Sequence, residues 1–535
     1  MTAQVIVVGS GPAGVSAAWP LVKAGAKVLL VDGGTAVPLP QGEGSYFELR
    51  TDQQSHWRFF LGANFYALKQ AGDVSPKLRV PGLAPTFAGF TDRFPVAVED
   101  FKLFGSLARG GLSNAWGAGV AGFTQAELAA LPVPYGEVRR GLQAVTKRIG
   151  VHGEVADDLG EFFGSGFHLQ PPPPLELPAQ VLLSRYQRQK KIFGAFVLGR
   201  GRNAVLTEPK GDRLPCNLCG LCLYGCSRKA IYNAAFDLEE LEKHENFRYV
   251  PRVLVEELMR VGEEWEVRGR NLENRAPVAL RAPAVVLACG AVGTGFLVLK
   301  ALRLVGIPIR LLSSPVAAFA LLIPNLLGCP TRQESFGLSQ LAFKLSFDPK
   351  LYAFGNLFST SGLPPSEFLL RSPLFLPTSR RLFRYFLPAM LVGNCFFPSV
   401  FSRHEMELCG DGSLRISGGY SAEFPAIARK THKALRRAFF SCGAWLLPKS
   451  FRVAPPGSDI HYAGTVPLRS SPQPHEALPS GEVAGLPGVW VADAAALPEL
   501  PAKPHTLLVM ALADRVGREV ARRLKAYAKG RIPND

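Results

Sequence analysis

The sequence predicts an α/β protein in which a Rossmann-like nucleotide-binding domain is joined to a second, α+β domain. A strand–glycine–helix–strand unit occupies residues 5–32, and a second apolar run that ends in glycines begins at Ala284. Between residues 311 and 455 the composition changes to one rich in Phe, Leu, Pro and Arg, without a βα pattern. A chain of 535 residues is long enough for two domains and a large core.

The first unit has the pattern of a dinucleotide site. The apolar run 5–8 is typical of a buried parallel strand, and Gly9, Gly11 and Gly14 after it form GxGxxG. In this motif the first glycine permits a tight turn, the second lets the backbone approach a pyrophosphate, and the third lets the helix pack close to the strand.

A helix and a second strand complete this unit. The helix opens at Pro12 and Ala13, and its N-terminus would direct free N–H groups and the positive end of its dipole at the phosphates. The strand 27–31 ends at Asp32, where a carboxylate can accept hydrogen bonds from a ribose. The position of the unit at the start of a long chain favours FAD over NAD.

Composition and charge narrow the classes of partner. The hydrophobic fraction of 47% excludes a disordered chain. The net charge of +17 would suit nucleic acid, anionic lipid or an anionic substrate, and because no segment resembles a nucleic-acid-binding module we expect no nucleic acid partner.

No secretory signal precedes the first strand, and no apolar run is long enough to span a membrane. These features predict a cytoplasmic protein that could attach peripherally to the inner face of the membrane.

A second glycine-rich stretch spans residues 108–119. Its glycines, among them Gly110, Gly111 and Gly117, indicate unusual backbone angles or a close approach of the backbone to a ligand. Ser113 and Asn114 could add hydrogen-bond donors. The alternative is an ordinary loop anchored by Trp116.

This stretch resembles the second flavin-contacting segment of the glucose–methanol–choline (GMC) oxidoreductases, and later segments resemble that family in the same order. Residues 284–293 resemble the strand that returns to the nucleotide sheet, residues 461–465 the HxxGT segment, residues 489–498 a strand and acid beside the flavin, and residues 504–513 the last helix. The resemblance implies FAD as cofactor. Besides the residues above, the contacts that it implies are Gly290, Asp493, Ala494 and Thr506. The glycine-rich stretch contains no His, so a histidyl link to the flavin is not expected.

The resemblance also implies oxidation of an alcohol by hydride transfer to flavin N5. His461 would be the base, since a neutral imidazole accepts a proton at physiological pH. The family has a second His or Asn near the last helix, but counting without a gap places Pro504 there and His505 one residue later. Because Pro cannot donate a hydrogen bond, either His505 serves or the pair is incomplete. The alternative function is a flavin-binding, membrane-associated protein that does not oxidise alcohols.

Four cysteines form a short run, Cys216, Cys219, Cys222 and Cys226, with the spacing CxxCxxCxxxC. This spacing is typical of thiolates that bind an iron–sulfur cluster, although Ser227 replaces the usual Pro. A cluster could relay electrons from the flavin to a quinone or a carrier protein. Zinc, or free thiols that brace a loop, are the alternatives.

The family pattern sets the expected division of the chain. We expect the FAD-binding domain to comprise residues 1–150, 227–310 and 456–535, and the substrate or cap domain to comprise residues 151–226 and 311–455. Within the latter, apolar residues alternate with arginines over residues 363–401, where Pro373, Pro377, Pro388 and Pro398 exclude one long helix. This segment is either an apolar cap over the substrate or an interfacial segment for anionic lipid. The apolar character of residues 311–401 favours an apolar or lipid-linked alcohol as substrate over a soluble sugar.

Overall fold

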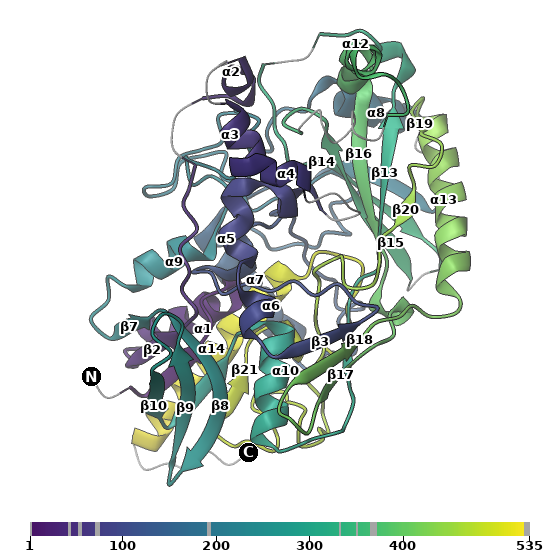
Figure 1. Cartoon of the computed structure of the whole chain (residues 1–535). Coiled ribbons are helices and arrows are strands. Elements are labelled where there is room, and N and C mark those ends of the chain that lie inside the picture. The colour runs from purple at the N-terminus through teal and green to yellow at the C-terminus, as the bar shows by residue number, and fades with distance from the viewer. Residues whose placement is uncertain are drawn as a thin grey trace.

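The computed structural model describes residues 3–40, 44–51, 56–69, 75–189, 194–330, 333–348, 351–363 and 372–528. Two regions built on separate sheets lie side by side (Figure 1). One contains both the first strand and the last helix of the chain, and the other is built on a seven-stranded sheet whose strands all come from the middle of the sequence.

The nucleotide sheet has five strands in the order β21-β11-β1-β2-β7, all parallel. Their bounds are β1 Val5–Val8, β2 Val28–Val31, β7 Phe247–Val250, β11 Ala284–Leu287 and β21 Val489–Val491. Every residue of β1, β2, β11 and β21 is buried, as the apolar runs predict. Because β1 lies at the centre, its carboxyl end opens between those of β11 and β2.

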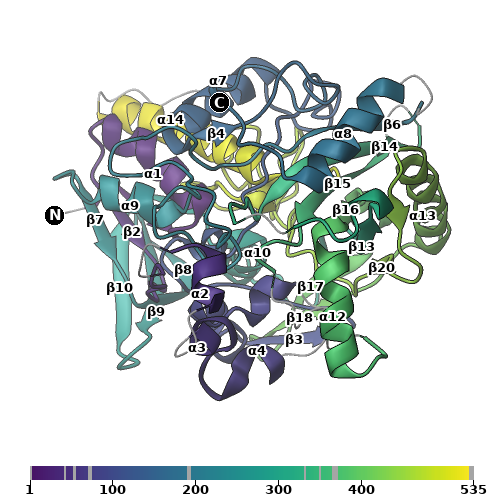
Figure 2. The same cartoon turned by 90° about the horizontal axis from the view of Figure 1, so that it is seen from above.

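Helices α1 and α14 pack against each other beside this sheet (Figure 2), although they lie at opposite ends of the chain. The helices of this region are α1 Pro12–Lys23, α7 Tyr135–Ile149, α9 Ala234–Leu241, α10 Gly290–Ala301 and α14 Thr506–Ala528. The sequence places a helix over 126–149, but the structure begins it at Tyr135, directly after Pro134. Proline favours the first turn of a helix and disfavours its interior, which explains the later start.

Two smaller sheets adjoin the nucleotide region. Strands β8 Val253–Val261, β9 Glu264–Asn271 and β10 Pro277–Ala282 form an antiparallel sheet. A four-stranded sheet follows the order β12-β17-β18-β3, from β12 Ile309–Leu311, β17 His404–Leu408, β18 Leu414–Ser417 and β3 Val96–Glu99. This second sheet joins strands from both of the domains expected from the sequence.

The seven-stranded sheet forms the other region, in the order β19-β13-β16-β15-β14-β6, with β20 also paired to β13. Helix α13, Phe424–Ser441, packs its Phe439 against Phe196, Phe319 and Phe343 of the sheet. Its strands are β6 Phe196–Arg200, β13 Val316–Leu322, β14 Ser339–Ser346, β15 Tyr352–Ser359, β16 Met390–Phe396, β19 Trp445–Leu446 and β20 Arg452–Val453, and the helix α8 is Leu177–Gln189.

The segment expected to be a cap or interfacial element divides at its prolines. Pro377 lies in the first turn of helix α12, Leu376–Phe386, and Pro388 lies in the short turn between this helix and β16. Residues 364–371 of the segment lie outside the described residues. Among the residues that the structure describes, no helix is both long and apolar enough to cross a membrane.

Short helices and strands complete the described elements. Most lie in the excursion between β2 and β3, which shows no periodicity in the sequence. They are α2 Tyr46–Thr51, α3 His56–Leu61, α4 Tyr66–Lys69, α5 Ala84–Phe87, α6 Phe90–Arg93, β4 Val151–His152 and β5 Leu169–Gln170.

Candidate active site

The glycines of GxGxxG build a cradle at the carboxyl end of β1. Gly9 has a positive φ of 103°, and a Cβ there would lie 2.4 Å from the carbonyl oxygen of Ala288. A Cβ at Gly14 would lie 1.8 Å from the carbonyl oxygen of Gly9. Both positions therefore require glycine, one for the turn and one for helix packing.

Gly11 serves a different purpose, since a Cβ there would meet no atom within 4 Å. It caps α1, which continues through Pro12 and Ala13, and no side chain caps this helix end. A Cβ at Gly290, at the start of α10, would also meet nothing within 4 Å. Open space thus lies before two helix N-termini, and the residues present fit a pyrophosphate that would accept hydrogen bonds there.

Asp32 is held inside the fold beside this cradle. Its carboxylate accepts hydrogen bonds from the Ser10 hydroxyl and, at 2.7 Å, from the Gly33 N–H. Burial raises the pKa of Asp32 to about 7 despite these bonds. Ser10 also accepts a hydrogen bond of 2.9 Å from the Gly110 N–H, so it joins the first motif to the second. Ser10 lies within GxGxxG, but the motif does not indicate this role.

The second glycine-rich stretch forms a short 3₁₀ turn, Gly111–Asn114, against the first. A Cβ at Gly111 would lie 3.2 Å from the Cα of Gly11. Trp116 donates a hydrogen bond of 2.8 Å to the Tyr232 carbonyl and so anchors the stretch. Gly117 borders open space. The two motifs, about 100 residues apart, therefore meet as the resemblance implies.

Ser113 and Asn114 hold this turn together with their side chains. The Ser113 hydroxyl donates to the Gly110 carbonyl at 2.5 Å, and the Asn114 amide donates to the carbonyls of Arg109 and Gly111. These donors are therefore used within the protein, in contrast to the expectation that they add donors for a ligand. Asn233 joins the same network and donates to the Asn114 side chain at 2.7 Å, and the sequence gives no signal for it.

Asp493 joins the start of α10 to the segment after β21. Its carboxylate accepts hydrogen bonds from the Gly290 N–H at 2.8 Å, the Thr294 hydroxyl at 2.5 Å and the Ala495 N–H at 2.9 Å. Burial raises its pKa to about 6. The carbonyl of the next residue, Ala494, accepts a hydrogen bond from the Gly464 N–H at 3.0 Å. This bond joins the segment after β21 to the segment that follows His461.

His461 and His505 face each other, with ring centroids 5.1 Å apart and planes at 89°. Helix α14 begins at Thr506, so His505 is the last residue before the helix, and Pro504 directly precedes His505. The Nδ1 atoms of both rings are buried and have no hydrogen-bond partner in the described part of the chain. Burial lowers the pKa of His461 to about 4 and that of His505 to about 3, so both imidazoles are neutral at neutral pH.

Two buried charged residues hold the loops that carry these histidines. The Asp459 carboxylate accepts from the N–H of His461 at 3.3 Å and from the N–H of Ser314 at 2.8 Å. Lys503, whose side chain is fully buried, forms an ion pair of 2.7 Å with Glu127. Each of these residues precedes its histidine by two positions, but their burial could not be predicted from the sequence.

Aromatic side chains surround the pair on the side of the seven-stranded sheet. Phe396, at the end of β16, stacks on His461 with centroids 4.8 Å apart. Phe396 packs against a buried cluster that includes Tyr352, Phe354 and, on the loop before His505, Ala502. The histidines therefore lie at the junction of the two regions, beside an apolar wall.

The four clustered cysteines do not form a metal site in this structure. All four are free thiols, and in the described part of the chain no three His, Cys, Asp or Glu side chains gather as metal ligands. Burial raises the pKa of Cys216 to about 11 and that of Cys222 well above its ordinary value. The spacing of Cys216, Cys219, Cys222 and Cys226 predicted a cluster that the geometry does not support.

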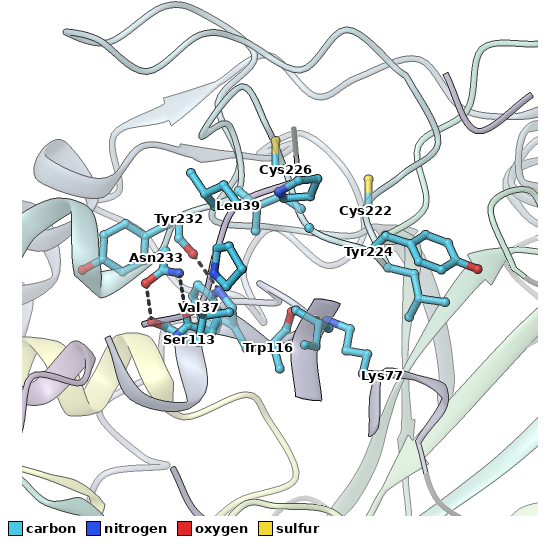
Figure 3. A pocket seen from close by; sticks show the side chains of 18 of the residues that line it. Val37, Leu39, Lys77, Ser113, Trp116, Cys222, Tyr224, Cys226, Tyr232 and Asn233 are labelled. Carbon is cyan, nitrogen blue, oxygen red and sulfur yellow. Dashed lines mark hydrogen bonds between the residues drawn. The ribbon is translucent and has the colours of Figure 1, made fainter. Parts of the chain in front are cut away.

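The loop that carries these cysteines is instead fixed through its backbone. The Gly220 N–H donates to the Ser335 carbonyl at 3.0 Å, and the Ser335 N–H donates to the Leu218 carbonyl at 2.7 Å. A small cavity of about 40 Å³ separates this loop from the second glycine-rich stretch. Figure 3 shows Ser113, Trp116 and Asn233 on one side of the cavity and Cys222 and Cys226 on the other. Its volume suits ordered water and is far too small for a nucleotide.

Comparisons with known proteins agree with the nucleotide cradle and with the whole fold. A family model described as glucose inhibited division protein A matches residues 4–49. The crystal structure of pyridoxine 4-oxidase from Mesorbium loti aligns with 97% of this chain and 99% of its own, at 13% identity and a TM-score of 0.61. The structure of formate oxidase aligns with 98% of this chain and 99% of its own, at 13% identity and a TM-score of 0.62. A search of curated proteins by sequence finds no match.

The chain has the GMC oxidoreductase fold. This finding confirms the predicted fold class, a Rossmann-like domain of the FAD-binding type with a second, substrate-binding domain. In the GMC fold of this chain, the glycine cradle belongs to the first region, and the histidine pair lies where that region meets the second.

Proposed function

We propose that this protein is an FAD-dependent oxidoreductase that oxidises an alcohol to a carbonyl compound, with His461 and His505 at the reacting hydroxyl group. The observation that carries the proposal is the pair of neutral imidazoles, with ring centroids 5.1 Å apart, whose Nδ1 atoms have no hydrogen-bond partner among the residues that the structure describes. Buried polar atoms are nearly always hydrogen-bonded, so two such atoms together favour a ligand between or beside the rings.

The residues that would hold FAD are those of the cradle. Gly11 borders the open space before α1, where backbone N–H groups would bind the pyrophosphate, and Gly290 borders open space at the start of α10, where the backbone would approach the same cofactor. Asp32 would accept hydrogen bonds from the ribose, and the turn Gly111–Asn114 would lie against the same cofactor. When bound, FAD would supply the hydride acceptor for oxidation of the alcohol.

The two imidazoles have different proposed roles at the hydroxyl group of the substrate. A neutral ring can accept a proton, and burial keeps His461 and His505 neutral far below pH 7. We assign His461 as the base that takes the hydroxyl proton and His505 as the donor of a hydrogen bond to the same oxygen. Phe396 fixes the plane of His461 by stacking, and Asp459 fixes its backbone.

An apolar alcohol suits this site better than a sugar. The wall beside the histidines consists of Phe396 and the cluster around Tyr352 and Phe354, and these rings would bury a hydrocarbon or aromatic substituent. A sugar would require several hydrogen-bonding partners, which this wall does not offer. A lipid-linked alcohol belongs to the same chemical class.

Electrons must leave the reduced protein before the next turnover. An oxidase passes them to oxygen, and a dehydrogenase passes them to a quinone or a carrier protein. Mixing the anaerobically reduced protein with oxygen, with a soluble quinone or with an artificial one-electron acceptor identifies the class by the fastest reoxidation.

The test is an anaerobic screen of alcohols against the FAD-loaded protein, with loss of the oxidised-flavin absorbance as the readout. Apolar alcohols are expected to bleach the flavin, and His461→Ala is expected to bind FAD but to react roughly 10²–10⁴-fold more slowly. His432→Ala is the matched control, because His432 lies on α13 and stacks on Phe451. If FAD binds and no alcohol or sugar reduces it, the alternative of a flavin-binding protein without alcohol oxidation is correct.

A further inference from the structure

Helix α12 presents an unusually apolar surface to solvent. It lies at one end of the seven-stranded sheet, at the upper edge of Figure 1. Phe375, just before the helix, is 79% exposed, Leu376 is 63% exposed and Tyr385 is 62% exposed. Leu374 and Leu382 are also exposed. Isolated exposed apolar residues are common, but a group of five on one short segment marks an interaction surface.

The charge of this segment has one sign. Arg380, Arg381 and Arg384 are all exposed, and none forms an ion pair with any residue that the structure describes. Residues 372–403 contain no Asp or Glu. At 3.6 residues per turn the three arginines occupy an arc of about 100° of the helix surface, and Leu382 lies on the opposite side. The exposed side chains of Leu376 and Tyr385 lie to either side of the arginines, so apolar and cationic side chains share the exposed surface of the helix.

The rest of the chain anchors α12 mainly at its C-terminal end. The Gly328 N–H donates to the carbonyl of Tyr385 at 3.2 Å, and the Thr360 hydroxyl donates to the carbonyl of Leu387 at 2.6 Å. At the other end Leu374, Phe375 and Leu376 remain exposed. The helix is thus fixed in the fold: Phe386 packs against the core of the seven-stranded sheet, and the apolar side chains that stay exposed are those of Leu374, Phe375, Leu376, Leu382 and Tyr385.

We propose that Leu374–Phe386 docks the protein peripherally on an anionic lipid bilayer. The exposed apolar side chains would enter the boundary between headgroups and acyl chains, and the three arginines would lie at the level of the anionic headgroups. Charge complementarity favours this occupant: a second copy of this chain would bring its own arginines, and its net charge of +17, to the same contact. The proposal stands independently of the proposed function.

The docking segment is also connected directly to the histidine pair. Helix α12 leads through one short turn into β16, Met390–Phe396, and Phe396 at its end stacks on His461. A single strand of seven residues therefore joins the proposed bilayer surface to the wall of the candidate active site.

The test is co-sedimentation of the full-length protein with vesicles of phosphatidylcholine alone or mixed with phosphatidylglycerol. We expect binding to the mixed vesicles that weakens as salt is added, because headgroup attraction is screened. The variant Arg380→Glu with Arg381→Glu is expected to lose at least roughly tenfold in vesicle affinity. Phe375→Ser is expected to weaken binding in both low and high salt.

Helix α13 supplies matched controls. Arg436→Glu with Arg437→Glu makes the same change of net charge, and Phe440→Ser removes an aromatic side chain that is 66% exposed. These controls are expected to leave vesicle binding nearly unchanged. The proposal is overturned if the protein does not bind the anionic vesicles, or if the α13 variants reduce binding as much as the α12 variants. It is also overturned if the α12 variants change only the oligomeric state.

Discussion

At the scale of single residues, the proposed role of His461 as the base requires an imidazole that is neutral at neutral pH, and burial lowers its pKa to about 4. The sequence indicates His461 but leaves Pro504 and His505 in competition for the second position. In the structure α14 begins at Thr506, which leaves His505 on the preceding loop with its ring beside that of His461, and we therefore propose His505 for this position. Helix starts are uncertain by a residue or two in any sequence pattern, so the sequence alone could not give this register.

The depressed pKa values of the two histidines predict how stability depends on pH. Between about pH 6.5 and pH 4 the unfolded chain binds protons on both imidazoles and the folded chain does not, so the free energy of unfolding falls as the pH falls. His461→Asn with His505→Asn removes this contribution. Thermal unfolding of the double variant should therefore be less sensitive to acid than that of the wild type.

The buried carboxyls Asp32, Asp459 and Asp493 act in the opposite direction, because their pKa values are raised and the folded state holds their protons. These three carboxyls are present in both the wild type and the double variant, so the difference in acid sensitivity between the two proteins reports on the histidines alone. Equal acid sensitivity in the two proteins would contradict the assignment of neutral, buried rings.

Two glycines of the first motif should respond differently to the same substitution. Gly14→Ala places a methyl group 1.8 Å from a carbonyl oxygen and should destabilise the fold itself, by about 1–3 kcal/mol or more. Gly11→Ala meets nothing within 4 Å, so the apoprotein should fold normally, but the methyl group would occupy the space assigned to the pyrophosphate. Thermal unfolding and FAD titration separate the two effects. Unchanged FAD affinity in Gly11→Ala would show that the cradle is not the nucleotide site.

At the scale of elements, a buried ion pair fixes the loop that joins β21 to α14. Lys503 pairs with Glu127 and also donates to the carbonyls of Gly122 and Phe162. Removing one partner leaves the other charge buried, so Lys503→Met or Glu127→Gln should each lower the free energy of unfolding by about 3–5 kcal/mol. The double variant should recover part of this loss, because it leaves no unpaired charge.

Chemical denaturation of the two single variants and the double variant measures this coupling. Strictly additive losses would mean that the two residues act independently. Because Lys503 lies two residues before His505, we also expect a slower flavin reduction in Lys503→Met with FAD affinity retained.

The cysteine loop is an element whose role cannot be assigned from the spacing of its cysteines alone. The spacing of its cysteines predicts metal ligands, but no group of metal ligands is found among the described residues, and burial raises the pKa values of Cys216 and Cys222 while backbone hydrogen bonds fix the loop. Native protein at pH 8 should therefore alkylate at these thiols at least roughly tenfold more slowly than urea-unfolded protein. Equally fast labelling would contradict this assignment, as would stoichiometric iron that is lost on Cys219→Ser.

At the scale of the whole molecule, the sequence predicts those helices and strands whose patterns lie within a short segment, but not the pairing of strands that are far apart in the chain. The buried runs and glycines of residues 5–32 identify β1, α1 and β2 because each feature is local. The pairing of β3 with β18 could not be predicted, since over 300 residues separate the strands and β3 itself is largely exposed. The seven-stranded sheet was also missed, because pairing among β13–β16 depends on contacts that no local pattern records.

We propose that this chain removes a hydride from an alcohol, with His461 taking the hydroxyl proton. The most direct test is anaerobic stopped-flow reduction of the FAD-loaded protein by an apolar alcohol, with hydrogen or deuterium on the carbinol carbon. We expect single-turnover bleaching of the flavin that is several-fold slower with deuterium, and much slower again in His461→Ala. Bleaching that ignores both the isotope and the loss of His461, or a bound flavin that no alcohol reduces, would contradict the account.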